Sequence, residues 1–178
     1  MPLRRLIVRD QPEWGPEEPE RVLRELLSKL DPWSYWVAAL SEDQAGDFAV
    51  VGTTGTFVIA VCGLAGPFNV EGDKATVGGA PIRGLREIRS EARRLKAKLG
   101  NAEVYSDVTP LVCLSRAAAG APIAVRGVRI VALVDLVPEI TRRERALLPN
   151  RAQRGAEALG TVLRSVRGGQ PVSEGDEE

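Results

Sequence analysis

Histidine is absent from this chain of 178 residues. Histidine is the usual general base and the commonest transition-metal ligand, so its absence excludes a Ser-His-Asp triad, a Cys-His pair and a zincin site. Metal chemistry would have to rest on carboxylates, which suit magnesium, manganese or calcium.

Net charge and long apolar runs are also missing. The 24 basic side chains balance 24 acidic ones, so overall charge makes no case for nucleic-acid or membrane binding. No apolar run reaches the length of a membrane span, and the N-terminus lacks the pattern of a signal peptide. We therefore expect a cytoplasmic protein without a membrane partner. The high Ala, Arg, Val and Gly content is typical of a GC-rich bacterial genome.

Cysteine is scarce: Cys62 and Cys113 each lie in an apolar, strand-like run. This setting is typical of small buried residues in a reducing compartment. The two thiols could form a disulfide only if the two runs became neighbouring strands, and we expect none.

Hydrophobic periodicity and turn residues divide the chain into helices and strands. They predict helices near residues 19–30, 81–99, 138–148 and 151–166, and strands near 33–40, 47–51, 56–61, 108–114 and 128–134, with a short strand pair in 69–77 and a loop over 115–127. This order predicts an α/β fold with a mixed central sheet flanked by helices and further helices at the C-terminus. We expect an irregular segment over 1–16, one domain over 17–167 and a disordered acidic tail over 168–178.

The stretch DFAVVGTTGTFVIAVCGLAGPF, residues 47–68, carries a family resemblance. It resembles the centre of the nuclease-related domain (NERD), in which an aspartate opens a strand and a glycine turn leads to an apolar strand ending in acid-x-lysine. The resemblance continues through GDKATVGGAPIRGLREIRSEARRLKAKL, TPLVCLS and VRGVRIVALVDL, and covers roughly residues 17–165. It implies a restriction-endonuclease-like core of the PD-(D/E)xK superfamily.

The resemblance implies a Mg²⁺-dependent phosphodiesterase site. Such a site uses two strand carboxylates for the metal and a lysine two residues after the second acid, on the same face of the strand. Asp47 matches the first acid, and Glu20 best matches a helix acid, with Glu17 or Glu18 as alternatives. Ala60 and Cys62 stand at the positions of the second acid and the lysine, so the catalytic set is vestigial.

Other interpretations of these residues remain open. Glu71 and Asp73, with Lys74 nearby, could replace the missing groups from a neighbouring turn. Asp47 could be a weak metal ligand, or only a turn residue that binds the backbone. Cys62 has no histidine to activate it as a nucleophile, and a packed core thiol is the simpler interpretation.

The predicted helix 81–99 is locally basic. Its basic residues exceed Glu87 and Glu91 by five positive charges, and the candidates for nucleic-acid contact are Arg83, Arg86, Arg89, Arg93, Arg94 and Lys96. Spacings of three and four place several of them in one stripe, which could attract a DNA or RNA backbone or form an ordinary solvated face. Further arginines follow in 142–167, and the acidic tail could cover either basic surface.

Three functions fit these patterns. The first is a catalytically inactive nuclease-related domain with a structural, regulatory or weak nucleic-acid-binding role and no cofactor. The second is an active Mg²⁺-dependent nuclease whose catalytic groups are displaced around Asp47, Glu20, Glu71 and Asp73. The third is a protein-interaction module with an unidentified protein partner.

Overall fold

The computed structural model describes residues 18–40, 44–117, 119–120 and 122–159. The segment 1–16, the acidic tail 168–178, Glu17 and the end of the last predicted helix lie outside these residues. Among the described helices, none is both long and apolar enough to cross a membrane.

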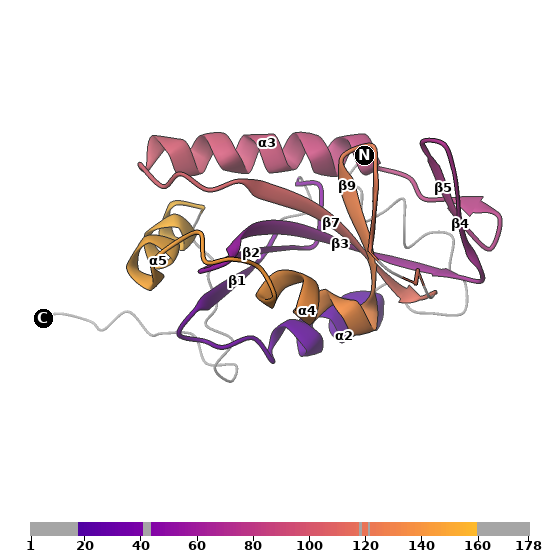
Figure 1. Ribbon diagram of the computed structural model, residues 1–178, viewed down its shortest axis with the longest axis horizontal. Coiled ribbons are helices and arrows are strands. Elements are labelled where there is room, and N and C mark those ends of the chain that lie inside the picture. The colour runs from indigo at the N-terminus through magenta and orange to yellow at the C-terminus, as the bar shows by residue number, and fades with distance from the viewer. Residues whose placement is uncertain (1–17, 41–43, 118, 121, 160–178) are drawn as a thin grey trace, which may run out of the picture.

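A six-stranded mixed sheet forms the centre of the molecule (Figure 1). Its strands in chain order are β1 (Tyr35–Ala39), β2 (Phe48–Gly52), β3 (Gly55–Ala65), β7 (Val108–Arg116), β8 (Ile123–Val125) and β9 (Val128–Ala132). Their spatial order is β1-β2-β3-β7-β9-β8. The pairs β3–β7 and β7–β9 are parallel and the other three are antiparallel. The predicted mixed sheet is therefore confirmed.

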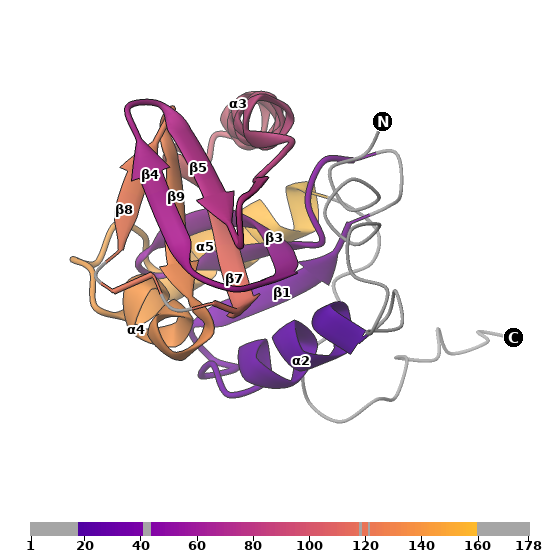
Figure 2. The ribbon, with the colours of Figure 1, turned by 90° about the vertical axis from the view of Figure 1, so that its right-hand side faces the viewer.

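Helices cover both faces of this sheet. They are α2 (Glu18–Leu27), α3 (Leu85–Asn101), α4 (Leu136–Thr141), which follows the 3-10 turn η1 (Leu133–Asp135), and α5 (Pro149–Ala158). Helix α3 lies on one face, and α2 and α4 lie on the other (Figures 1 and 2). We name these two sides the α3 face and the α2/α4 face.

Strand alternation separates two large apolar cores, and a third, smaller core joins Leu99 of α3 to Ala152 and Ala156 of α5. On the α3 face, side chains of β3 and β7 pack with the predicted apolar stripe of α3, and that stripe is buried at Leu85, Ile88, Ala92, Leu95 and Leu99. On the α2/α4 face, Phe57, Ile59 and Val61 pack with Leu23 and with residues of α4. The central strands are buried on both sides, as their continuous apolar runs predicted.

A small second sheet extends from the end of β3 (Figure 2). It contains β4 (Phe68–Glu71), β5 (Lys74–Val77) and β6 (Ala80–Pro81). Ala75 and Val77 of β5 are buried in the core of the α3 face. The backbones of Gly66 and Gly78 come close at its base, where a Cβ on Gly78 would lie 2.4 Å from the Ala65 carbonyl oxygen.

Two expectations for the C-terminal half were wrong. The helix predicted over 138–148 is only the short α4, because tertiary hydrogen bonds redirect the chain after it. Thr54 Oγ1 donates to the Ile140 carbonyl at 2.6 Å, and the Thr53 carbonyl accepts from the amides of Ala146 and Leu147 at 2.8 and 3.1 Å. The next helix, predicted to begin near residue 151, begins at Pro149, whose missing N–H is not needed in the first turn.

The loop predicted over 115–127 contains a strand. Short strand β8 pairs with β9 across a turn in which Arg126 and Gly127 both have positive φ. Strand β8 has only three residues, which is too short for an alternation of apolar and polar residues to be recognised in the sequence. Strands β3 and β7 also run further than predicted, to Ala65 and Arg116.

The glycine contact at the base of the small sheet gives a first prediction. Gly78→Ala should lower the free energy of unfolding by about 1–3 kcal/mol more than Gly72→Ala, measured by urea denaturation. The matched control is close, because φ is +58° at Gly78 and +62° at Gly72, while nothing lies within 4 Å of a Cβ at Gly72. Equal losses in the two variants would show that the small sheet does not depend on this contact.

Candidate functional site

Ala60 and Cys62 lie inside the protein. Both are 0% exposed, and both belong to the core of the α3 face, so the prediction that they share one side of β3 is confirmed. The same core holds Ile88 of α3 and Val77 of β5. The two positions that would carry the second acid and the lysine are therefore enclosed by apolar side chains.

Asp47 has a structural role at the start of β2. It is 2% exposed, and its Oδ2 accepts a hydrogen bond from the Val61 amide at 2.9 Å. Its own amide donates to the Ile59 carbonyl at 2.8 Å. The first residue of β2, Phe48, pairs with Ile59, but β3 continues beyond Ile59. The Val61 amide of this continuation therefore donates to the Asp47 carboxylate instead of to a carbonyl of β2. The interpretation of Asp47 as a backbone-binding residue accounts for these contacts.

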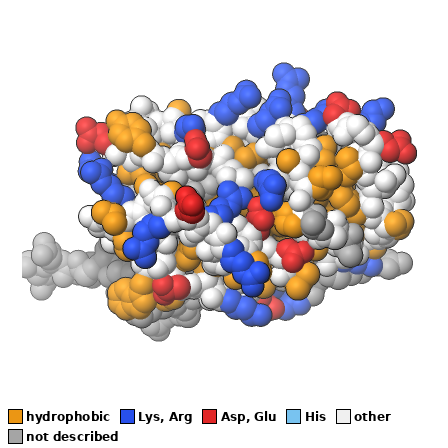
Figure 3. All heavy atoms as spheres, viewed as in Figure 1, with side chains coloured by type: hydrophobic (Ala, Val, Ile, Leu, Met, Phe, Trp, Pro, Cys, Tyr) orange, Lys and Arg blue, Asp and Glu red, His pale blue; other side chains and the backbone are white. Residues whose placement is uncertain are grey.

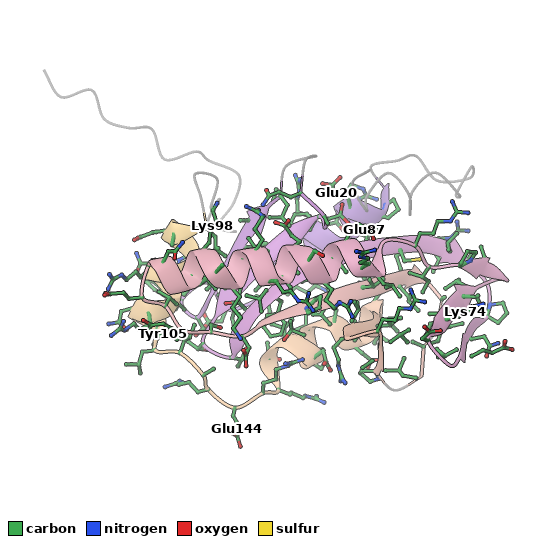
Figure 4. All side chains as sticks on the ribbon, turned by 90° about the horizontal axis from the view of Figure 1, so that it is seen from above. Glu20, Lys74, Glu87, Lys98, Tyr105 and Glu144 are labelled. Carbon is green, nitrogen blue, oxygen red and sulfur yellow. The ribbon has the colours of Figure 1, made fainter. Side chains whose placement is uncertain are left out.

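Glu20 lies on the other side of the sheet from Ala60 and Cys62. It is in the first turn of α2, which covers the α2/α4 face (Figure 1). Glu20 and Glu87 project close together when the molecule is seen from above, but their helices lie on opposite faces (Figure 4). The described residues contain no group of three or more Asp, Glu, Cys or His side chains that could hold a metal ion.

These residues do not fit a magnesium ion held as the resemblance implies. Magnesium demands octahedral oxygen coordination and usually one or two carboxylates with substrate phosphates. The Asp47 carboxylate is buried and already binds the Val61 amide, and the side chains of Ala60 and Cys62 offer no oxygen.

The hairpin acids do not complete the site. Glu71 and Lys74 are register partners next to the turn between β4 and β5, and both are exposed. Asp73 Oδ2 accepts a hydrogen bond from Arg126 Nη2 at 2.9 Å. Lys74 lies at the outer end of the molecule (Figure 4), whereas Asp47 is buried in the main sheet.

The two cysteines lie on neighbouring strands but on opposite faces. Cys113 is the register partner of Val61, and Cys62 is the partner of Leu114, so their side chains point to different cores. Neither forms a disulfide, as expected. Burial raises the pKa of the Cys113 thiol to about 12, and Cys62 adds to the rise, so Cys113 stays protonated at neutral pH.

The six candidate residues for nucleic-acid contact, which lie just before α3 or within it, divide into two groups. Three of them bind other parts of the described chain: Arg89 donates to the Arg126 carbonyl, Arg94 pairs with Glu91, and Lys96 pairs with Asp107. The hydrogen bond to Glu91 raises the pKa of Arg94. Glu91 is buried and also accepts from Gln44 Nε2 at 3.1 Å. These contacts are structural.

The remaining three candidates are Arg83, which lies just before α3, and Arg86 and Arg93 of α3. They are called the outer arginines. All are exposed, and within the described residues none pairs with a carboxylate. Arg86 and Arg93 are two turns apart and lie on one side of α3. Basic side chains gather along the edge of the molecule formed by α3 (Figure 3). The predicted stripe is thus reduced to these outer positions.

A second charged cluster was missed because its members are far apart in sequence. Arg129 of β9 and Arg143, just after α4, both bind Glu139 Oε1, at 3.0 and 2.9 Å. They line an open cleft of about 640 Å³ together with Arg142. Arg142 and Arg143 belong to the arginines noted in the sequence after residue 141. For Arg129, the only sequence signal is its position between apolar residues in VRIVA, which indicates a side chain that is not part of the apolar core.

Comparison with protein-family models, with curated proteins and with solved structures finds no match to this chain.

The role of Asp47 can be tested by stability. Asp47→Ala should lower the free energy of unfolding by about 1–3 kcal/mol, because the buried Val61 amide loses its acceptor. Asp47→Asn should lose less, since its amide oxygen can accept the same bond. Chemical denaturation of both variants provides the measurement. An Asp47→Ala protein as stable as the wild type would show that this hydrogen bond does not hold the start of β2.

Introducing an acid and a lysine at positions 60 and 62 should destabilise the protein rather than form a metal site. Ala60→Glu with Cys62→Lys places two ionisable groups where both native side chains are 0% exposed. The expected loss is at least about 3–5 kcal/mol of unfolding free energy, from overpacking and charge burial. Cys62→Val is the control of similar volume and should cost less than about 1.5 kcal/mol. A stable double variant would mean that this part of the core can open.

Proposed function

We propose that this chain is a nuclease-related domain that has lost metal-dependent cleavage and binds the phosphate backbone of nucleic acid weakly through the outer arginines. The order of α2, the antiparallel run β1–β2–β3, α3 and parallel β7 supports a restriction-endonuclease-like core. Asp47 at the opening of β2, before a glycine turn, also agrees with the resemblance to the nuclease-related domain.

The observation that carries the binding proposal is the exposure of Arg83, Arg86 and Arg93 without carboxylate partners in the described chain. A guanidinium that is not neutralised by the protein can displace counterions from a polyanion, and this release makes binding dependent on salt. The helix carries no aromatic side chain to stack on bases. Binding should therefore be insensitive to sequence.

The binding test uses fluorescence anisotropy of a labelled DNA duplex over a range of salt concentrations. The triple variant Arg83→Gln, Arg86→Gln, Arg93→Gln should bind more weakly, and the slope of log K against log salt should fall by about 2–3, close to 0.9 for each lost phosphate contact. The matched control is Lys29→Gln, Lys74→Gln, Arg145→Gln, which removes the same charge from exposed positions away from α3. An equal loss of DNA affinity in both triple variants would show that only net charge matters and would contradict a specific role for α3.

The same proteins decide whether cleavage remains. Incubation of the wild-type protein with duplex DNA, single-stranded DNA and RNA in magnesium or manganese should leave all three substrates intact. Cleavage by the wild type that Asp47→Asn abolishes while the variant remains folded would instead support the active nuclease with displaced catalytic groups.

A further inference from the structure

The cleft beside α4 is lined by residues of β7, β9, η1 and α4. Helix α4 lies on the α2/α4 face, across the sheet from α3 (Figures 1 and 2). Basic and acidic side chains are intermingled on the side of the molecule that Figure 3 shows. The charged and hydroxyl residues that line the cleft are Thr109, Arg129, Asp135, Glu139, Arg142 and Arg143. They come from β7, β9, η1, α4 and the segment that follows α4.

Arg143 is held in place before any ligand arrives. Its Cζ lies 5.0 Å from the centroid of the buried Phe57 ring. Its Nε donates to the Glu139 carbonyl and its Nη2 to Glu139 Oε1, both at 2.9 Å. A guanidinium fixed in this way loses little conformational freedom on binding an anion.

The cleft has more positive than negative charge. Arg129 Nε also donates to Glu139 Oε1, so one oxygen of a carboxylate that is 12% exposed serves two arginines. Arg142 is exposed, and its guanidinium makes no ion pair within the described residues. Asp135 is the remaining carboxylate of the lining. Three guanidiniums therefore face two carboxylates.

We propose that this cleft binds a phosphate monoester, either on a free nucleotide or at the end of a nucleic acid. A dianion matches several converging guanidiniums better than a single carboxylate does, and the planar fork of arginine fits phosphate oxygens. The Thr109 hydroxyl, which accepts a long 3.5 Å bond from Arg143 Nη1, can donate its own proton to the phosphate. Asp135 repels the phosphate, so the ligand sits toward the arginines.

Arg129 and Arg143 also support the fold, since both bind Glu139 and Arg143 caps the end of α4. Within the described residues the Arg142 side chain makes no hydrogen bond or ion pair. A substitution of Arg142 can therefore weaken phosphate binding without a loss of structural contacts. The probe is inorganic phosphate, titrated into the full chain and followed by the arginine Nε–Hε signals in NMR. Saturable shifts are expected for Arg129 and Arg143.

Arg142→Gln should weaken phosphate binding roughly tenfold or more, as expected for a lost charged hydrogen bond, with an unchanged melting temperature. Arg145→Gln is the matched control: it removes another exposed arginine, which lies outside the cleft lining, and should bind like the wild type. Asp135→Asn should tighten binding. Shifts that do not saturate, or equal affinities for the wild type, Arg142→Gln and Arg145→Gln, would overturn the proposal.

Two further ligands distinguish the source of the phosphate. A nucleoside monophosphate is compared with an oligonucleotide carrying a 5′-phosphate or a 5′-hydroxyl. Arg142-dependent preference for the phosphorylated oligonucleotide indicates a nucleic-acid end, and competition only by the mononucleotide indicates a free nucleotide. The triple variant of the outer arginines should keep its affinity for inorganic phosphate, so this proposal and the backbone-binding proposal fail independently.

Discussion

The parallel pairing of β3 with β7 is the constraint on which the rest of the structure depends. All of β3 except its last residue is buried, and the middle of β7 is buried with it. Each apolar side chain that leaves water contributes about 1.5–3 kcal/mol, and the two strands supply such side chains to both cores. Helix α3 must cover one face and helices α2 and α4 the other for that burial to be complete.

This pairing leaves little room for polar chemistry on the central strands. An acid and a lysine at positions 60 and 62 would need water or a metal ion in front of them, but Ile88 and Leu95 of α3 and Val77 of the small sheet fill the surrounding core. Ala60 is small enough to permit this packing. An acid and a lysine at these positions would therefore require changes in the helix and the hairpin as well as in two side chains. Asp47 has a hydrogen-bonding role in the sheet itself, as the acceptor for the Val61 amide.

Sequence patterns predicted the secondary structure correctly where neighbouring residues determine it. The apolar stripe of α3 repeats every three or four residues, so its buried face could be read from the sequence, and all five of its positions are buried. The helix expected over 138–148 failed because its backbone groups bind Thr53 and Thr54, which are about ninety residues earlier in the chain. Helix-forming residues do not outweigh such contacts once the β2–β3 turn is in place.

The candidate sites show the same limit. The apolar run of β3 predicted that Cys62 is buried, and this is confirmed. Strand alternation could not show which elements cover Ala60 and Cys62, because alternation assigns a side but does not say what covers that side. The basic stripe on α3 could be predicted from the sequence. The structure was needed to show that Arg89, Arg94 and Lys96 bind partners within the protein. The Arg129–Glu139–Arg143 cluster depends on β9 lying beside α4, and no local pattern contains that information.

The two basic surfaces differ in shape, and shape determines what each can bind. Among the outer arginines, Arg86 and Arg93 lie on the exposed side of α3 and Arg83 lies just before the helix, so their charges are spread along a line that suits successive phosphates of a polymer. The arginines beside α4 converge on one cleft, and Arg143 is fixed there by Phe57 and Glu139. Converging, fixed donors favour a single compact anion over an extended one. Because the buried sheet separates the two surfaces, a ligand at one of them leaves the other open.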